Sequence, residues 1–206
     1  MEKAKNVDDY IAMQQNAIQS NPECSVSHYN LATALLGKKN YKEAEKAFLC
    51  ALDSSPHLVE AYIQLGGIRL AQNDLDGCLY YNRLAVKYRA GFAIGYGNIG
   101  FALLQKGEYD EAVAVLKKAI KFNPKFIQAY ATLANAYLMN KEIDESIEIN
   151  LKAMEIDSNF PIIHNNLAIA YIEKKEYKLS IKHCDKSIEL GYPVAEEILE
   201  ELKKHR

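Results

Sequence analysis

The feature that most constrains the fold is an internal repeat of 34 residues. Five segments superimpose at that spacing without insertion or deletion, and they start at Ser25, Val59, Ala93, Ile127 and Pro161. Positions within each segment are numbered as slots, from slot 1 at its first residue. Three slots hold only small side chains: Ala32, Gly66, Gly100, Ala134 and Ala168 at slot 8; Ala44, Cys78, Ala112, Ser146 and Ser180 at slot 20; Ala51, Ala85, Ala119, Ala153 and Ser187 at slot 27. Small residues recur where two helices approach closely, so these three slots predict close helix–helix packing and not a catalytic site.

Each segment carries apolar residues at steps of three and four, which is the helical period. The first segment predicts one helix over residues 27–38 and a second over residues 41–54. Proline or glycine stands between many predicted helices, at Pro56, Gly91 and Pro124, and stops one helix before the next. Each pair of helices buries its apolar side only against its neighbours, so the array is expected to form one continuous stack.

Two stretches carry a family resemblance. Residues 30–56, NLATALLGKKNYKEAEKAFLCALDSSP, and residues 98–124, NIGFALLQKGEYDEAVAVLKKAIKFNP, closely resemble the tetratricopeptide repeat. The resemblance implies an all-α, right-handed α-α superhelix, or solenoid, of five units with a capping helix at each end. The expected units are 25–58, 59–92, 93–126, 127–160 and 161–192, and the expected caps are 1–24 and 193–206. The usual aromatic residue at slot 4 is replaced by His28 and His164 in the end units, and Asn82 replaces an apolar residue at slot 24.

Composition excludes several functional classes. The formal net charge is −2, whereas a nucleic-acid interface needs a clustered basic face. The N-terminal stretch lacks the pattern of a signal peptide, and the longest uncharged stretch, residues 90–105, is too short to span a bilayer. We therefore expect a soluble, cytoplasmic protein without membrane insertion.

No motif predicts catalysis, a metal or a cofactor. The four cysteines are scattered and lack zinc-ligand spacing, and Cys78 and Cys184 are expected to be structural buried thiols. Residues 95–100 read GYGNIG, which matches a dinucleotide fingerprint, but no predicted strand precedes them. The chain is therefore expected to be non-enzymatic.

The family resemblance implies that the first helix of each unit lines a concave groove through slots 2, 5, 9, 12 and 13. Only Glu60 and Glu173 are charged among these 25 positions, so an apolar peptide or an amphipathic helix is the expected ligand. Alternatively, the apolar side chains pack on one another or on the caps. The candidate partner-binding residues are Tyr29, Thr33, Ile63, Gly67, Leu70, Ile94, Gly97, Asn98, Phe101, Leu104, Asn135, Leu138, Met139, Asn165, Asn166 and Ile169.

Two glycines interrupt this apolar face in mid-helix. Gly67 and Gly97 either hollow the groove beside Phe101, so that a ligand main chain comes close, or reflect drift at tolerant positions. The asparagines Asn98, Asn135 and Asn166 either bond a partner's main chain or are solvated.

Many family members hold the acidic C-terminal tail of a chaperone between asparagines and basic residues. Asn135 and Asn166 occupy the asparagine slots of that clamp, but Ala131, Ala195 and Leu199 stand where cations are needed. A chaperone tail is therefore not the expected ligand.

A second candidate surface consists of Tyr80, Tyr81 and Tyr88, because aromatic anchors favour interfaces. Taken together, the sequence predicts an adaptor that binds another protein. The resemblance also permits a self-assembling scaffold, in which the groove of one molecule takes the terminal helix of the next.

Overall fold

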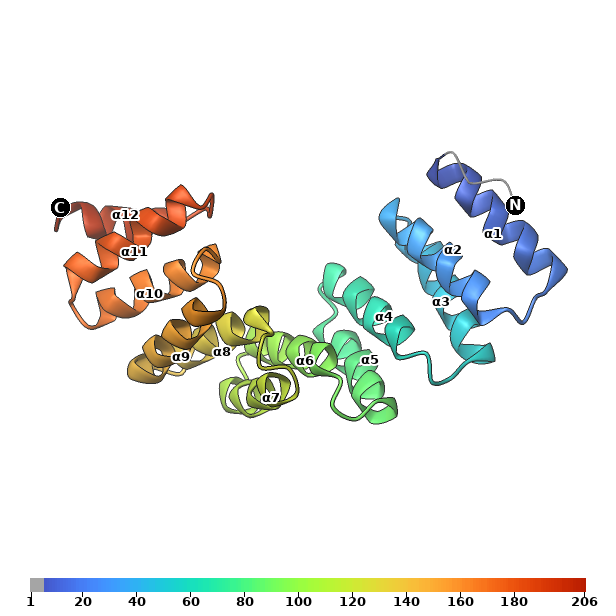
Figure 1. Ribbon diagram of the computed structural model, residues 1–206, viewed down its shortest axis with the longest axis horizontal. Coiled ribbons are helices and arrows are strands. Elements are labelled where there is room, and N and C mark those ends of the chain that lie inside the picture. Colours follow the sequence, from blue (N-terminus) through green and yellow to red (C-terminus); the bar gives the residue numbers. More distant parts are fainter. Residues whose placement is uncertain (1–5) are drawn as a thin grey trace. The chain divides into compact units, whose positions relative to one another are not determined.

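The computed structural model describes residues 6–206, which form twelve α-helices and no strand (Figure 1). The all-α prediction is thus confirmed, while the first five residues of the expected N-terminal cap lie outside the described range. The helices are α1 (Val7–Ser20), α2 (Ser25–Gly37), α3 (Tyr41–Ser54), α4 (Val59–Ala71), α5 (Leu75–Tyr88), α6 (Ala93–Lys106), α7 (Tyr109–Phe122), α8 (Ile127–Met139), α9 (Ile143–Ile156), α10 (Pro161–Glu173), α11 (Tyr177–Glu189) and α12 (Glu196–Lys203). None of the helices in this range is long and apolar enough to cross a membrane.

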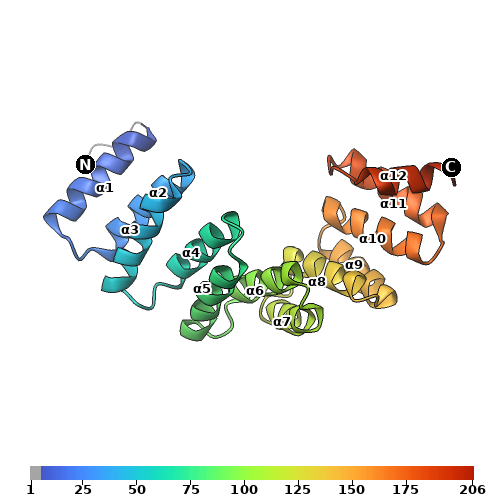
Figure 2. The same ribbon diagram turned by 180° about the vertical axis from the view of Figure 1, so that it is seen from behind.

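The chain divides into two compact bodies, one ending at Gly95 and the other beginning at Tyr96, so that the boundary falls inside α6. We call them the N-terminal and the C-terminal body. Helices α2 with α3 and α4 with α5 pack as pairs in the first, and α8 with α9 and α10 with α11 do so in the second (Figure 2). In each sequence repeat, the first helix is called the A-helix (α2, α4, α6, α8, α10) and the second the B-helix (α3, α5, α7, α9, α11).

The turn after every A-helix has the same geometry. The residue at slot 15 adopts positive φ in all five repeats: Lys39 (60°), Asn73 (60°), Gly107 (80°), Lys141 (65°) and Lys175 (60°). In all five, the N–H of slot 16 donates to the carbonyl oxygen of slot 11 at 2.8–3.0 Å. This bond satisfies a carbonyl that the helix end leaves open. Glycine, the residue that adopts positive φ most readily, occupies slot 15 only in the third repeat, as Gly107.

The small-residue slots lie at contacts between helices. All fifteen residues at slots 8, 20 and 27 are buried, as predicted. A Cβ atom on Gly100 would lie 2.4 Å from Cγ of Leu116, and one on Gly66 would lie 2.3 Å from Nδ2 of Asn82. Slot 8 therefore faces slot 24. The polar residue Asn82 is tolerated in the core because its Nδ2 donates to the Cys78 carbonyl oxygen at 2.8 Å.

The two histidines at slot 4 preserve a hydrogen bond that tyrosine makes elsewhere. The hydroxyl groups of Tyr62 and Tyr130 donate to the carbonyl oxygens of Pro56 and Pro124, six residues earlier, at 3.1 and 3.2 Å. Nε2 of His28 and of His164 lies 2.8 Å from the equivalent carbonyl oxygens, those of Pro22 and Ser158. Substitution at slot 4 thus changes the side chain but keeps the link between consecutive repeats.

The C-terminal helix α12 closes the core of the last repeat. Leu202 is buried in a cluster with Ala168 and Cys184, and Ile198 and Val194 pack against that cluster. The acidic side of the helix faces solvent, as its amphipathic sequence predicts. The GYGNIG stretch lies across the first half of α6 and follows a loop, so the strand that a dinucleotide site requires is not there.

Candidate functional site

The candidate residues differ in their exposure to solvent. We call the residues at slots 2, 5, 9, 12 and 13 of the A-helices the A-helix stripe. Of the sixteen candidates, five are exposed, namely Thr33, Gly67, Ile94, Phe101 and Met139. Six are half-buried: Tyr29, Ile63, Leu70, Asn98, Asn135 and Ile169. Five are buried: Gly97, Leu104, Leu138, Asn165 and Asn166. The exposed and half-buried members are the ones that a partner can reach directly.

The C-terminal body holds a hollow of about 360 Å³ on this stripe. Three A-helices and the loop after α11 contribute to its lining, and none of the lining side chains is charged. We call it the C-terminal hollow, and its lining consists of Phe101, Leu104, Gln128, Ala131, Thr132, Asn135, Phe160, Ile162 and Tyr192. The structure therefore brings together three of the candidates, Phe101, Leu104 and Asn135.

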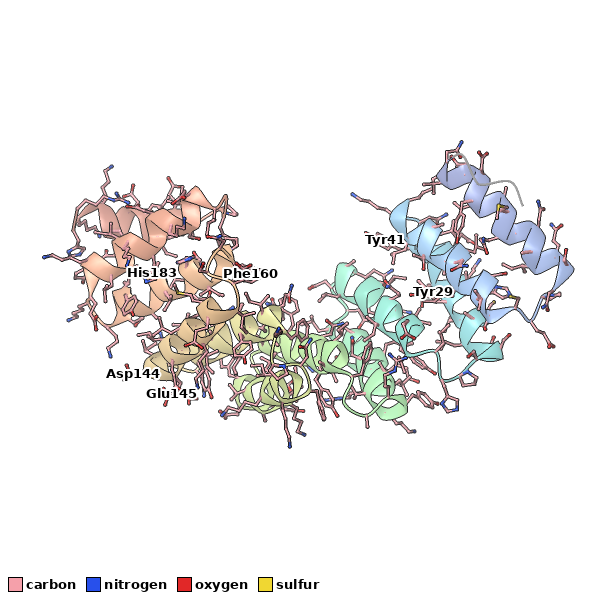
Figure 3. All side chains as sticks on the ribbon, in the orientation of Figure 1. Tyr29, Tyr41, Asp144, Glu145, Phe160 and His183 are labelled. Carbon is pink, nitrogen blue, oxygen red and sulfur yellow. The ribbon has the colours of Figure 1, made fainter. Side chains whose placement is uncertain are left out.

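Aromatic residues outside the stripe complete this hollow. Phe160 directly precedes α10 (Figure 3), and Tyr192 lies in the turn after α11. Selecting residues by the five stripe slots misses both. The sequence did contain a pattern that points to Phe160, because slot 34 holds a large apolar residue in four successive repeats: Leu58, Phe92, Phe126 and Phe160.

The space over Gly97 is not open to a ligand. A Cβ atom on Gly97 would lie 2.7 Å from Cε1 of Phe126, so that ring already takes the space that the missing side chain leaves. Gly67 differs, because no atom lies within 4 Å of a Cβ built there. Of the two glycines, only Gly67 leaves room beside the A-helix.

Two neighbouring asparagines of α10 have different roles. Asn166 Nδ2 donates to the Ala131 carbonyl oxygen of α8 at 3.0 Å, which joins consecutive A-helices. Asn165 is also buried, and its Oδ1 has no hydrogen-bond partner among the described residues. Asn166 is thus a structural residue in this state, whereas the amides of Gln128 and Asn135 border the C-terminal hollow.

The N-terminal body holds a larger hollow, of about 620 Å³, between α1 and α2. We call it the N-terminal hollow, and its lining consists of Asn6, Val7, Tyr10, Tyr29, Asn30, Thr33, Ala34, Gly37 and Lys38. It includes the candidates Tyr29 and Thr33, and Figure 3 labels Tyr29 on α2. At one end, Lys38 Nζ forms an ion pair with Asp8 Oδ1 at 2.5 Å. Ile63, Gly67 and Leu70 do not line this hollow.

The predicted tyrosine cluster divides into two ring contacts. Tyr80 and Tyr81 meet edge to face at 5.2 Å between ring centroids. Tyr88 instead stacks on Tyr62 at 5.5 Å and contacts His57 edge to face at 4.9 Å. Burial, together with the neighbouring Tyr88, raises the pKa of Tyr62 to about 12, so its hydroxyl stays protonated and donates to Pro56.

Burial shifts the pKa values of several titratable groups in the core. Burial raises the pKa of the Cys78 and Cys184 thiols, which makes them poor nucleophiles and agrees with the structural role predicted for them. Nδ1 of His164 lies 3.0 Å from Nδ1 of His183, and burial lowers the pKa of His183 to about 4. Across residues 6–206, no three histidine, cysteine or acidic side chains gather closely enough to hold a metal ion.

Family models described as tetratricopeptide repeat match residues 11–59, 29–91 and 127–160, and one described as TPR repeat matches residues 100–141. The chain belongs to the tetratricopeptide repeat family. The resemblance inferred from residues 30–56 and 98–124 is thereby confirmed. Among curated proteins, none matches the sequence significantly.

Solved tetratricopeptide repeat structures share this fold. YrrB, described as a TPR protein with an unusual peptide-binding site, is 17% identical with a TM-score of 0.73, and the match covers 93% of this chain and 97% of YrrB. MamA from Desulfovibrio magneticus RS-1 is 22% identical with a TM-score of 0.72, over 81% of this chain and 94% of MamA. A chain of the APC/C hetero-tetramer Cut9–Hcn1 is 17% identical with a TM-score of 0.78, over 96% of this chain and 39% of that one. At these identities, the likeness establishes the fold of the repeats alone.

Proposed function

We propose that this tetratricopeptide repeat protein is a non-enzymatic interaction module of the cytoplasm that binds an apolar peptide or an amphipathic helix of another protein on its A-helix stripe. The observation that carries the proposal is the C-terminal hollow, in which Phe101, Phe160 and Tyr192 surround a space of about 360 Å³ without a charged side chain. Aromatic side chains that line a concave surface are typical of peptide-binding sites. The four cysteines are all free thiols, which fits a reducing compartment.

The size and polarity of the hollow define its ligand. Each fully buried apolar side chain of a partner contributes about 1.5–3 kcal/mol before ordering costs. A Kd of about 1 μM corresponds to roughly 8 kcal/mol, so several anchors along the stripe are needed. The amides of Gln128 and Asn135 can bond the main chain of the ligand between those anchors.

The lining also disfavours an acidic ligand. A terminal carboxylate that enters the C-terminal hollow loses hydration and meets no cation in return. Peptide binding is described for YrrB, and the proposal extends that kind of ligand, and not a chaperone tail, to this chain.

The first prediction concerns two exposed stripe residues, Phe101 (38% exposed) and Met139 (51%). Short random peptides displayed on phage are selected against the intact chain. The double variant Phe101→Glu, Met139→Glu is expected to bind the selected peptides at least about tenfold more weakly, which is 1.4 kcal/mol, because each glutamate places a charge against an apolar ligand. Isothermal titration measures the affinity, and circular dichroism verifies that helicity is unchanged.

The matched control replaces two B-helix residues of similar exposure, Leu151 (45%) and Leu179 (38%), by glutamate. This variant is expected to bind as the intact chain does. If the peptides still bind the stripe variant but no longer bind the control variant, the binding surface lies on the B-helices. Light scattering at several protein concentrations tests the alternative function, a self-assembling scaffold. Particles whose mass grows with protein concentration would favour self-assembly.

A further inference from the structure

One face of α8 runs through the C-terminal hollow. It supplies four lining residues at spacings of three and four along the helix: Gln128, Ala131, Thr132 and Asn135. Residues at such spacings share one side of a helix. They therefore form a row with an amide side chain at each end and two short side chains between them.

In the middle of this row the polar atoms already have hydrogen-bond partners. The Ala131 carbonyl oxygen accepts from Nδ2 of Asn166 at 3.0 Å. Oγ1 of Thr132 donates to the Gln128 carbonyl oxygen at 2.8 Å. The middle of the row is thus suited to apolar atoms of a ligand.

The two ends of the row are suited to the main chain of a ligand. The side-chain amides of Gln128 and Asn135 have no hydrogen-bond partner among residues 6–206, and the two residues are seven positions apart. Seven positions correspond to about 10.5 Å along the helix axis. An extended chain, which rises about 3.3 Å per residue, covers that distance in three residues. An α-helical ligand fits less well, because its main-chain groups are already bonded to one another.

We propose that the C-terminal hollow binds one large apolar side chain of an extended peptide segment from another protein, and that Ala131 sets the size of the side chain that it accepts. This inference rests on the proposed function and specifies its ligand. The amides of Gln128 and Asn135 hold the main chain on either side of this anchor. Successive side chains of an extended chain point to opposite faces, so one of the two residues between the amides turns its side chain toward Ala131.

The small side chain at slot 5 of α8 leaves this space free. The residues at slot 5 of the five repeats are Tyr29, Ile63, Gly97, Ala131 and Asn165. Over Gly97, the ring of Phe126 already takes the space of the missing side chain. Phe160 occupies the same slot 34 one repeat later, but together with Ala131 it lines a hollow of about 360 Å³. A larger residue at position 131 would fill that hollow.

The wall on the side of Tyr192 is formed before a ligand binds. Gly191 adopts a φ of 83°, which glycine does without strain. Its N–H donates to the Ile188 carbonyl oxygen at 2.8 Å, and the Tyr192 N–H donates to that of Ser187 at 3.0 Å. These bonds fix the turn after α11, so a peptide need not order it on binding.

A double-mutant cycle between the hollow and the peptide tests the proposal. Peptides selected from the random phage library are scanned with alanine, and the position at which alanine weakens binding most is the anchor. Isothermal titration then measures the affinities of the selected peptide and its anchor→Ala form for the intact chain, Ala131→Leu and Gly67→Leu. Gly67→Leu is the matched control, because Gly67 belongs to the A-helix stripe but lies outside the hollow, and no atom lies within 4 Å of a Cβ there.

Ala131→Leu is expected to weaken binding of the selected peptide at least about tenfold, because the leucine takes the place of the anchor. Gly67→Leu is expected to change binding by no more than about twofold. Alanine at the anchor is expected to weaken binding to the intact chain at least about tenfold, but to Ala131→Leu only about twofold. If Ala131→Leu loses helicity in circular dichroism, Tyr192→Ala replaces it in the cycle, since this substitution removes a wall outside the helices.

Three other outcomes would overturn the proposal. If alanine at the anchor weakens binding equally in the intact chain and in the hollow variant, the anchor lies elsewhere on the A-helix stripe, and the proposed function still stands. A gain of peptide helicity on binding, seen in circular dichroism difference spectra, would assign the stripe to an amphipathic helix. Peptides that bind Phe101→Glu, Met139→Glu as tightly as the intact chain, or failure to select any peptide, would refute the proposed function together with this inference.

Discussion

Replacing Gly100 by alanine is expected to lower the free energy of unfolding by about 1–3 kcal/mol, although alanine favours a helix over glycine by about 1 kcal/mol. The added Cβ atom would lie 2.4 Å from Cγ and 2.6 Å from Cδ2 of Leu116. Leu116 is fully buried, so its side chain has nowhere to move. Urea denaturation followed by circular dichroism measures the change.

The matched control is Gly67→Ala. No atom lies within 4 Å of a Cβ at Gly67, so the same substitution is expected to stabilise the protein by up to about 1 kcal/mol through helix propensity alone. In the double variant Gly100→Ala, Leu116→Ala, the smaller side chain at position 116 removes the clash. The loss of unfolding free energy in this double variant is expected to be smaller than the sum of the two single-variant losses, by about 0.5–3 kcal/mol. Destabilisation by both glycine variants alike would contradict close packing at slot 8.

The second large effect is a dependence of stability on pH that comes from the histidine pair. The Ser158 carbonyl oxygen accepts from Nε2 of His164, and the Nδ1 atom of the same ring faces His183. The Nδ1 atoms of the two histidines lie 3.0 Å apart, and His183 stacks on Tyr171 at a centroid distance of 5.7 Å. Burial first, and then the charges of His164 and Lys182, lower the pKa of His183 from 6.5 to about 4.

The sign of the effect follows from that depressed pKa. Between pH 6.5 and about 4, the unfolded chain binds the His183 proton and the folded chain does not. The stability that neutral His183 contributes is therefore complete above pH 6.5 and is lost as the pH falls towards 4. The slope due to this one group approaches about 1.4 kcal/mol per pH unit at most.

The variant His183→Gln isolates this contribution. Its amide can still donate to Nδ1 of His164 but does not titrate in this range. Unfolding free energies of the intact chain and the variant are measured from pH 7.5 to 4, and their difference cancels the carboxylates that titrate in both proteins. The intact chain is expected to lose stability faster than the variant below pH 6.5. Parallel curves would show that His183 does not carry the effect.

The repeat pattern predicted those parts of the fold that recur in every repeat. Every small residue at slots 8, 20 and 27 is buried, because the 34-residue period brings each of these slots to a contact between helices in all five units. The departures at His28 and His164 were visible in the sequence. The sequence did not show that the hydrogen bond of slot 4 is kept: the imidazole ring takes the place of the phenol and still reaches the carbonyl oxygen six residues earlier.

Contacts made by residues outside the five stripe slots limited the prediction of the site. Phe126 fills the space over Gly97 because slot 34 reaches the preceding A-helix, which the five stripe slots do not register. Leu104 and Leu138 belong to the stripe but are mostly covered by their neighbours. Lys141 and Lys175 adopt the left-handed conformation although lysine gives no such signal, since the hydrogen bond from slot 16 to slot 11 imposes that turn.

The most direct test of the central claim, that a partner binds the A-helix stripe, is a map of the bound surface. A selected peptide is titrated into the ¹⁵N-labelled chain, and the backbone amide shifts are followed residue by residue. The account predicts the largest shifts around the C-terminal hollow, at Phe101, Ala131 and Asn135. Shifts confined to the B-helices, at Leu151 and Leu179, with the hollow unchanged at saturating peptide, would contradict it.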